Sequence, residues 1–386
     1  MWRNLASNAL TFLVVLFFLF GGALIWAQTT YVSEGPLEQA ICVQVDRGSN
    51  FRRVSQALAE DGAVSSPMLF RVGADYAGKT SQLKAGSFLV PEGASMQEIV
   101  DIVTRGGAST CGTEVVYRVG ITRASVQVRE LDPATGRFEE IAQFNPEEDA
   151  VPEAYAEVKG EAETRYRVAL AEGVTSWQIV QELDQIDVLE GEVEDIPAEG
   201  TLAPDSYEIA PGDTRADLVA RMRSRQDQIL AEAWANRQDG VPLQSPEEAL
   251  ILASIIEKET GTPDERFLVS SVFNNRLEQG MRLQTDPTVI YGITRGEGVL
   301  GRGLRQSELR RETPWNTYVI DGLPPTPIAN PGRASIEAAL NPDETGYIFF
   351  VAKTLDPSDG HNFAETLAEH NGNVAAYRAL EAQRDN

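Results

Sequence analysis

Two carboxylic acids, Glu257 and Glu259, end a strongly apolar stretch that runs from 249 to 260. The spacing of its apolar residues predicts a helix, and the glycine and proline that follow are typical of a helix end. A carboxyl group on an apolar face near the negative end of a helix is expected to have a raised pKa, as a general acid at neutral pH requires. On a helical wheel Glu257 projects elsewhere, whereas Glu259 shares the apolar stripe of Leu252, Ile255 and Ile256.

Two alternatives accompany this hypothesis. Glu257 and Glu259 could be solvated side chains at a frayed helix end. If they do chemistry, they cannot form an opposed pair, because residues two apart on a helix point in divergent directions. A reaction with two carboxyl groups then takes its second from elsewhere, such as Glu199, Asp205 or Asp286. In the other scheme one carboxyl group acts first as acid and then as base, and the substrate supplies its own nucleophile.

Other reaction chemistries lack their motifs. His361 and His370 are nine residues apart with no cysteine nearby, and no H-E-x-x-H occurs, so we expect neither a catalytic metal nor another cofactor. No serine has the G-x-S-x-G setting of a hydrolase, no phosphate-binding (Walker) loop is expected, and no G-x-G-x-x-G fingerprint follows a predicted strand. Carboxylate acid–base chemistry is what remains.

The chain is long and acidic. It has 386 residues, with 58 acidic against 33 basic side chains and a net charge of -25. Two or three units are therefore expected, and the charge argues against binding to nucleic acid or to an anionic membrane surface. The two cysteines, Cys42 and Cys111, could pair in an oxidising compartment or could remain two unpaired small apolar residues.

An uncharged segment near the N-terminus indicates the cellular compartment in which the protein lies. No charged residue occurs between Arg3 and Glu34, and residues 9–28 are almost entirely apolar. This length suits a membrane-spanning helix, with residues 1–8 in the cytoplasm and the acidic remainder outside. A cleaved signal peptide is the alternative, and in either case the bulk of the protein lies outside the cytoplasm.

Residues 38–108 are predicted to form a small α+β domain. The expected elements are a helix from Phe51 closed by Gly62, a helix over 67–74, a strand over 87–90 and a helix from Ser95 closed by Gly106-Gly107. Part of this pattern recurs further on, which suggests a duplicated strand–helix module. Gly48, Val54 and Leu58 match Gly173, Ile179 and Leu183, while Ser87-Phe88, Gly93, Ile99 and Val103 match Ser206-Tyr207, Gly212, Leu218 and Met222.

The segment 109–163 lies between the two copies and differs from them in texture. Strands are expected over 113–120, 124–131 and 137–144, with a hairpin turn at 132–136. Residues 145–163 are acidic and lack apolar periodicity, so an exposed loop or linker is expected there.

Gln284, Thr285 and Asp286 form a polar cluster before Pro287. Such a cluster can orient sugar hydroxyls or simply cap the helix that the proline begins.

Several long motifs together resemble the endolytic murein transglycosylase (YceG-like) family. They are residues 199–207, 253–260, Asn275-Arg276-Leu277, 281–292, Asn316-Thr317-Tyr318, Gly322-Leu323-Pro324-Pro325 with Ile328, Pro331-Gly332 and His361-Asn362-Phe363. The resemblance implies an α+β protein with an N-terminal transmembrane helix, a LysM-like domain over 38–108 and a catalytic domain over 164–386. Within the last, 164–225 is a repeat-like subdomain and 242–380 a catalytic core. The segment 109–163, with its hairpin and acidic linker, departs from the family core and is interpreted as an insertion.

The resemblance also implies an activity. The protein would cleave the bond between N-acetylmuramic acid and N-acetylglucosamine in nascent peptidoglycan and leave 1,6-anhydro ends, with Glu259 as the single acid/base. The implied substrate-binding residues are Gln284, Thr285, Asp286, Tyr291, Asn316, Tyr318, Glu199 and Tyr207. A single-pass anchor in the inner membrane, a periplasmic catalytic domain and contact with peptidoglycan synthases and division proteins are implied as well. A hydrolytic muramidase and a non-catalytic peptidoglycan-binding scaffold are the alternatives.

Overall fold

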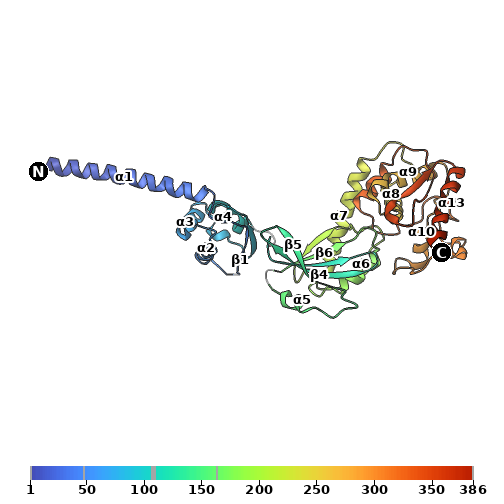
Figure 1. Ribbon diagram of the computed structural model, residues 1–386, viewed down its shortest axis with the longest axis horizontal. Coiled ribbons are helices and arrows are strands. Elements are labelled where there is room, and N and C mark those ends of the chain that lie inside the picture. Colours follow the sequence, from blue (N-terminus) through green and yellow to red (C-terminus); the bar gives the residue numbers. More distant parts are fainter. Residues whose placement is uncertain (1, 47, 106–109, 162–163, 385–386) are drawn as a thin grey trace. The chain divides into compact units, whose positions relative to one another are not determined.

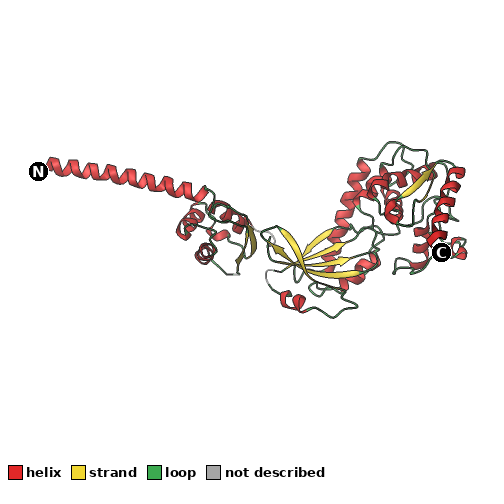
Figure 2. Ribbon diagram, viewed as in Figure 1, coloured by secondary structure: helices red, strands yellow, loops and turns green. Residues whose placement is uncertain are grey.

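The chain divides into two compact units. The computed structural model describes residues 2–46, 48–105, 110–161 and 164–384 (Figure 1). The first unit comprises residues 1–115, 127–143 and 151–165, and the second comprises residues 116–126, 144–150 and 166–386. Helices and strands occur in both units (Figure 2), which confirms the mixed α+β class. The predicted domain boundaries remain predictions.

The chain begins with a long apolar helix, α1 (Trp2–Val32). Its segment Leu10–Val32 has a mean hydropathy of 2.5 and is not buried inside the protein. At about 1.5 Å per residue this segment exceeds the roughly 30 Å hydrocarbon core of a bilayer. An N-terminal helix that could cross a membrane is thus confirmed, although a signal sequence would share these properties.

The rest of the first unit contains a small α+β core. Its elements are β1 (Ile41–Val45), α2 (Phe51–Glu60), α3 (Pro67–Tyr76), β2 (Gly86–Val90) and α4 (Met96–Arg105). The capping box at the start of α4 is confirmed, because Ser95 and Glu98 exchange hydrogen bonds. Cys42 and Cys111 form a disulfide, which settles the open question of their pairing. The end predicted at Gly106-Gly107 lies outside the described residues, and the LysM-like character remains a prediction.

Residues 73–80 read G-A-D-Y-A-G-K-T, which fits the pattern of a phosphate-binding loop. In the structure they form the end of α3 and the turn after it, rather than a loop between a strand and a helix. The lysine of the pattern, Lys79, is paired with Asp101. These residues therefore lack the geometry that binds nucleotide phosphates.

Five strands form one sheet in the order β5-β4-β3-β6-β7. They are β3 (Thr113–Val119), β4 (Ala124–Asp132), β5 (Arg137–Phe144), β6 (Arg165–Leu170) and β7 (Ser206–Ile209). The three strands and the hairpin turn predicted for 113–144 are confirmed. The loop predicted for 145–163 is wrong at α5 (Glu153–Val158), where Tyr155 is buried within an acidic stretch of the sequence.

The predicted repeat is present in three dimensions. Strands β1 and β2 pair antiparallel with Val43 opposite Phe88, and β6 and β7 pair antiparallel with Val168 opposite Tyr207. Each first strand leads into a helix, α2 or α6 (Ser176–Asp184), and each second strand into another, α4 or α7 (Arg215–Ala235). The matched residues occupy equivalent places in both copies. The copies differ between the first helix and the second strand. The first copy has a further α-helix there, α3, and the second copy has none.

The remaining elements belong to the second unit. They are α8 (Pro246–Glu259), α9 (Arg266–Glu278), α10 (Asp286–Thr294), α11 (Gln306–Leu309), α12 (Arg333–Leu340), β8 (Phe349–Ala352), β9 (His361–Ala364) and α13 (Leu367–Arg384). Short 3-10 helices span Thr80–Gln82, Pro263–Glu265 and Pro357–Asp359.

Helix α8 is the centre of the second unit. Its N-terminus is capped by Ser245, whose side chain accepts a hydrogen bond from the Glu248 N–H, and Pro246 occupies the first turn. All residues from 249 to 256 are buried, because α7, α9, α10 and α12 pack around the helix. The helix is therefore apolar on every side rather than along one stripe, and its last turn emerges where the buried sequence ends.

Candidate active site

The carboxyl group of Glu259 is enclosed at the C-terminal end of α8, although the residue keeps some exposure to solvent. Burial raises the pKa of Glu259 to about 7; the Thr285 hydroxyl and Arg276 oppose this rise, and Asp286 adds to it. A substantial fraction of this acid is thus protonated at neutral pH. The expected raised pKa is confirmed, and the alternative of a frayed, solvated helix end is wrong.

A buried group of threonines holds the Glu259 carboxyl group. Thr285 is at the N-cap position of α10, but its hydroxyl does not cap the helix; it donates to Glu259 Oε1. The Thr285 N–H donates to Thr317 Oγ1 at 3.0 Å, and Thr288 Oγ1 lies 2.9 Å from the same oxygen. All three threonines are almost completely buried. The capping alternative is therefore wrong for Thr285, whose hydroxyl orients the acid.

Asp286 and Arg276 add opposite charges beside Glu259. Asp286 Oδ1 accepts a 2.6 Å hydrogen bond from the Tyr318 hydroxyl. Arg276 reaches the site from α9 and donates from Nε to Ile348 O at 2.6 Å and from Nη1 to Leu283 O. These bonds fix the guanidinium group, and its charge favours the ionised form of Glu259. Sequence reasoning placed Arg276 in a motif but gave it no role.

Glu257 has a different environment. Its side chain is only 7% exposed, so it is not solvated. One carboxylate oxygen accepts a hydrogen bond from the Gly332 N–H at 3.0 Å, and the other lies 3.9 Å from Arg266 Nη2. Glu257 therefore points away from Thr285, as the divergence of residues two apart predicts, and it ties α8 to the start of α12.

Glu199 is a second buried acid near α8 and α10. Burial raises its pKa to about 7, against hydrogen bonds that lower it. It accepts from the Ser176 N–H at 2.8 Å, from Asn330 Nδ2 at 3.3 Å and from the Tyr291 hydroxyl at 3.3 Å. Helix α10 thus carries a partner of Glu259 at its start and a partner of Glu199 near its end.

The other predicted site residues differ in their surroundings. Gln284 has a φ of 52°, a strained conformation for a residue with a side chain, directly before Thr285. The Asn316 side chain is buried and donates to three carbonyl groups of residues 308–311, so it shapes the loop before Tyr318. The Tyr207 hydroxyl donates to the backbone carbonyl of Ala203 at 2.8 Å.

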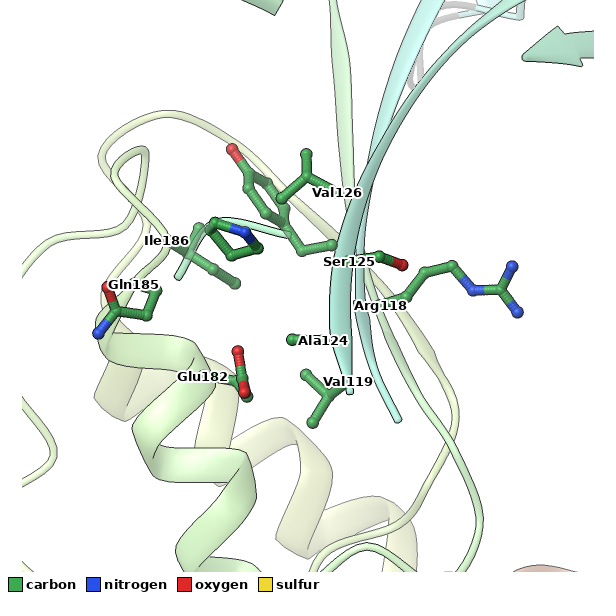
Figure 3. A pocket seen from close by; sticks show the side chains of 10 residues that line it. Arg118, Val119, Ala124, Ser125, Val126, Glu182, Gln185 and Ile186 are labelled. Atoms are coloured by element: carbon green, nitrogen blue, oxygen red, sulfur yellow. The ribbon is translucent and has the colours of Figure 1, made fainter. Parts of the chain in front are cut away.

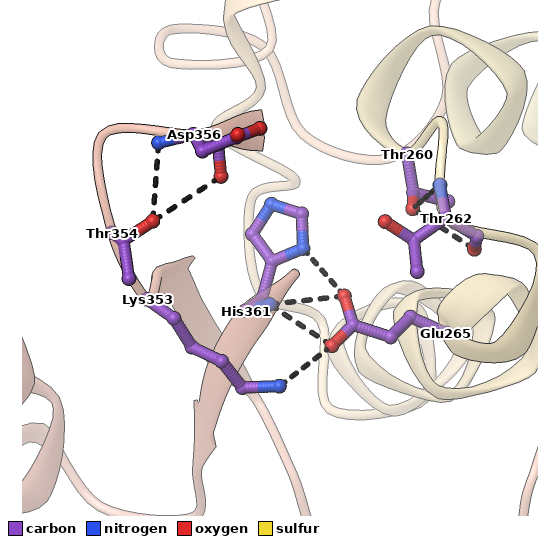
Figure 4. Close-up of polar contacts among 7 residues, drawn as sticks. All are labelled: Thr260, Thr262, Glu265, Lys353, Thr354, Asp356 and His361. Carbon is purple, nitrogen blue, oxygen red and sulfur yellow. Dashed lines mark hydrogen bonds and ion pairs between the residues drawn. The ribbon is translucent and has the colours of Figure 1, made fainter. Parts of the chain in front are cut away.

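A polar clamp holds the turn that follows α8 (Figure 4). Glu265 accepts hydrogen bonds of 2.9 Å from the His361 N–H and lies 2.9 Å from His361 Nδ1 and 3.1 Å from Lys353 Nζ. Burial alone would raise the pKa of Glu265, but these bonds bring it below its ordinary value. The clamp joins the turn beyond Thr260 to strands β8 and β9. Sequence reasoning listed His361 in a motif but did not find Glu265.

A pocket elsewhere in the second unit, lined by Glu182, Gln185 and Ile186 among others, contains no residue of the Glu259 group (Figure 3). Glu182 lies in it, and burial, with Glu147 nearby, raises the pKa of Glu182 to about 6. Within the described residues, His, Cys, Asp and Glu side chains form no group of three that could hold a metal ion. We therefore centre the site on Glu259.

The chain matches one known protein family over most of its length. The profile of the YceG-like family matches residues 43–143 and 143–376. The chain belongs to the YceG-like family. It is 28% identical to a Bacillus subtilis protein named endolytic murein transglycosylase, over 92% of this chain and 89% of that protein. It is 25% identical to a Streptococcus pneumoniae (strain D39) protein of the same name, over 97% of this chain and 66% of that protein.

Among solved structures, a YceG-like protein from Listeria monocytogenes is similar to the chain. The two are 24% identical with a TM-score of 0.46, and the match covers 86% of this chain and 98% of the other.

Proposed function

We propose that this YceG-like protein is an endolytic lytic transglycosylase of peptidoglycan. It cleaves the bond between N-acetylmuramic acid and N-acetylglucosamine within nascent glycan strands. The observation that carries the proposal is the enclosed carboxyl group of Glu259, whose pKa is about 7. Such a group can be protonated before the reaction and ionised after its first step. The names of the related proteins supply the substrate class.

In the proposed reaction, Glu259 performs both proton transfers. Its protonated carboxyl group donates to the glycosidic oxygen, and the bond from that oxygen to C1 of the muramic acid breaks. The C6 hydroxyl of the same sugar then attacks C1, and the Glu259 carboxylate accepts the hydroxyl proton. The product has a 1,6-anhydro ring, and the acid is restored without water entering the reaction.

Neighbouring groups support each stage of this cycle. The Thr285 hydroxyl orients one carboxyl oxygen. The Arg276 charge stabilises the ionised Glu259 that exists between the two transfers. Asp286, held by Tyr318, is placed to stabilise positive charge that develops on the sugar ring. We propose Gln284, Asp286, Tyr291, Tyr318, Glu199 and Tyr207 as substrate-binding residues, and Asn316 as a residue that shapes their loop.

The proposal extends to the location of the enzyme. With α1 as a single-pass anchor in the inner membrane, the catalytic domain lies in the periplasm and acts on strands near the membrane surface. The disulfide between Cys42 and Cys111 suits an oxidising compartment. We further propose that residues 38–108 act as a LysM-like glycan-binding domain, and that the enzyme works with peptidoglycan synthases and division proteins.

A digest of purified peptidoglycan by the full-length protein tests the activity. Anhydro-ended products, identified by mass spectrometry, are expected; reducing ends would indicate a hydrolytic muramidase, and no products a non-catalytic scaffold. Glu259→Gln should abolish cleavage, whereas Glu247→Gln, an exposed control at the other end of α8, should retain it. Full activity in Glu259→Gln would refute the assignment.

A further inference from the structure

Helix α3 exposes an apolar stripe in the first unit. Met68, Val72 and Tyr76 are spaced four residues apart and are 67%, 55% and 96% exposed. Single exposed apolar side chains are common on protein surfaces. Three large ones that share a face of one ten-residue helix are not accounted for by the core, which α3 meets through Phe70 and Ala74.

Helix α3 lies beside the end of the apolar helix α1 (Figure 1). The ring of Tyr31, in the last turn of α1, packs directly on Gly73 of α3; a side chain at Gly73 would overlap it. On a helical wheel at about 100° per residue, the stripe is centred roughly 100° round α3 from Gly73, on the side away from Phe70. Leu69, which packs partly against the core, falls between Gly73 and the stripe. The apolar surface is thus continuous from Tyr31 to Met68, Val72 and Tyr76.

The end of α1 is also fixed to the rest of the first unit. The Gly35 N–H donates to Gly93 O at 2.9 Å, and the Gly93 N–H donates to Leu37 O at 2.9 Å. These hydrogen bonds hold the residues that follow α1 against the turn before α4, a helix that packs against both α1 and α3. Tyr31 is in the last turn of the segment Leu10–Val32, so a bilayer that α1 spans would have its headgroup layer close to this turn.

We propose that the α3 stripe of Met68, Val72 and Tyr76 lies in the interfacial layer of the membrane that α1 spans. The occupant is the lipid bilayer, because the stripe is continuous with the membrane helix. The contact is apolar and aromatic rather than basic, so it does not require anionic lipid and agrees with the acidic charge of the chain. This inference rests on the proposed membrane anchoring by α1.

Spin labelling of the full-length protein in phosphatidylcholine nanodiscs tests the inference. The chain has two cysteines, and both are in the disulfide, so one introduced cysteine carries the only label. The test positions are Val72→Cys and Tyr76→Cys. The matched control is Val299→Cys, because Val299 is similarly exposed at 62% but lies in the second unit. Leu16→Cys, in the middle of α1, reports on the anchoring itself.

Power saturation with oxygen, which concentrates in lipid, and with a water-soluble nickel chelate distinguishes the outcomes. At Val72 and Tyr76 we expect oxygen to relax the label several-fold more than nickel, as at Leu16, and the reverse at Val299. Nickel accessibility at Val72 and Tyr76, together with a lipid signal at Leu16, would overturn the proposed contact of α3 with the membrane but leave the anchoring by α1 intact. A water signal at Leu16 would overturn the anchoring. Protection from both reagents at Val72 and Tyr76 would indicate a protein partner and would also overturn the inference.

Discussion

Replacing Thr285 by valine should move the pH profile of cleavage upward. Valine keeps the shape of threonine but removes the hydroxyl that donates to Glu259, and this bond opposes the rise in the pKa of Glu259. A hydrogen bond to a charged group contributes about 1.5–3 kcal/mol, and one pKa unit corresponds to about 1.4 kcal/mol. The pKa of Glu259 should therefore rise from about 7 by about 1–2 units.

Because the reaction starts from protonated Glu259, activity is lost as the pH rises through this pKa. The descending, alkaline limb of the profile should therefore shift upward in Thr285→Val, and the maximal rate should fall because the acid is less well oriented. The assay is cleavage of soluble, uncrosslinked glycan strands from pH 5 to 9, with anhydro ends counted by mass spectrometry. Thr285→Ser, which keeps the hydroxyl, is the control. An alkaline limb that stays in place or moves downward in Thr285→Val would refute the reasoning.

Two further predictions concern stability. Glu259→Gln should stabilise the protein at pH 8, because the native pKa of Glu259 is raised from 4.5 to about 7. Ionisation of this group therefore costs the folded state up to about 3 kcal/mol above pH 7. This cost declines below pH 7 and disappears near pH 4. Urea unfolding at pH 8 and pH 4 measures this difference, and an equal effect at both would contradict it. Glu265→Gln should lower stability at pH 7 by about 1–3 kcal/mol, because His361 and Lys353 lose a charged acceptor. The native pKa of Glu265 is lowered, so this loss should shrink as the pH falls through that value; a loss unchanged in acid would argue against the clamp.

Local patterns in the sequence predicted much of the fold. The capping box at Ser95 and the strands of 113–144 depend on neighbours within a few residues, and they appear as expected. The repeat was detectable because Gly173, Ile179 and Leu183 keep the spacing of their counterparts. The loop expected at 145–163 contains α5, which gave no periodic signal because its one buried residue, Tyr155, lies within an acidic stretch.

The site was less accessible to sequence reasoning, because its partners are distant along the chain. The helical wheel favoured Glu259 because that residue shares an apolar stripe. However, α8 is buried on every side, so an apolar stripe does not distinguish Glu259 from Glu257. The distinction comes from Thr285 on one side and from Arg266 with Gly332 on the other. Arg276 and Glu265 gave no local signal, since each acts through contacts with backbone or side chains tens of residues away.

The two copies of the strand–helix module place different features on the same framework. Their paired strands keep the same register, whereas the segments that connect the first helix to the second strand differ between the copies. In the first copy this segment became α3 with its outward apolar stripe. In the second it brought Glu199 against Ser176 and Asn330. Chimeras that exchange only these connections would therefore alter surface contacts and acid placement while leaving both sheets paired.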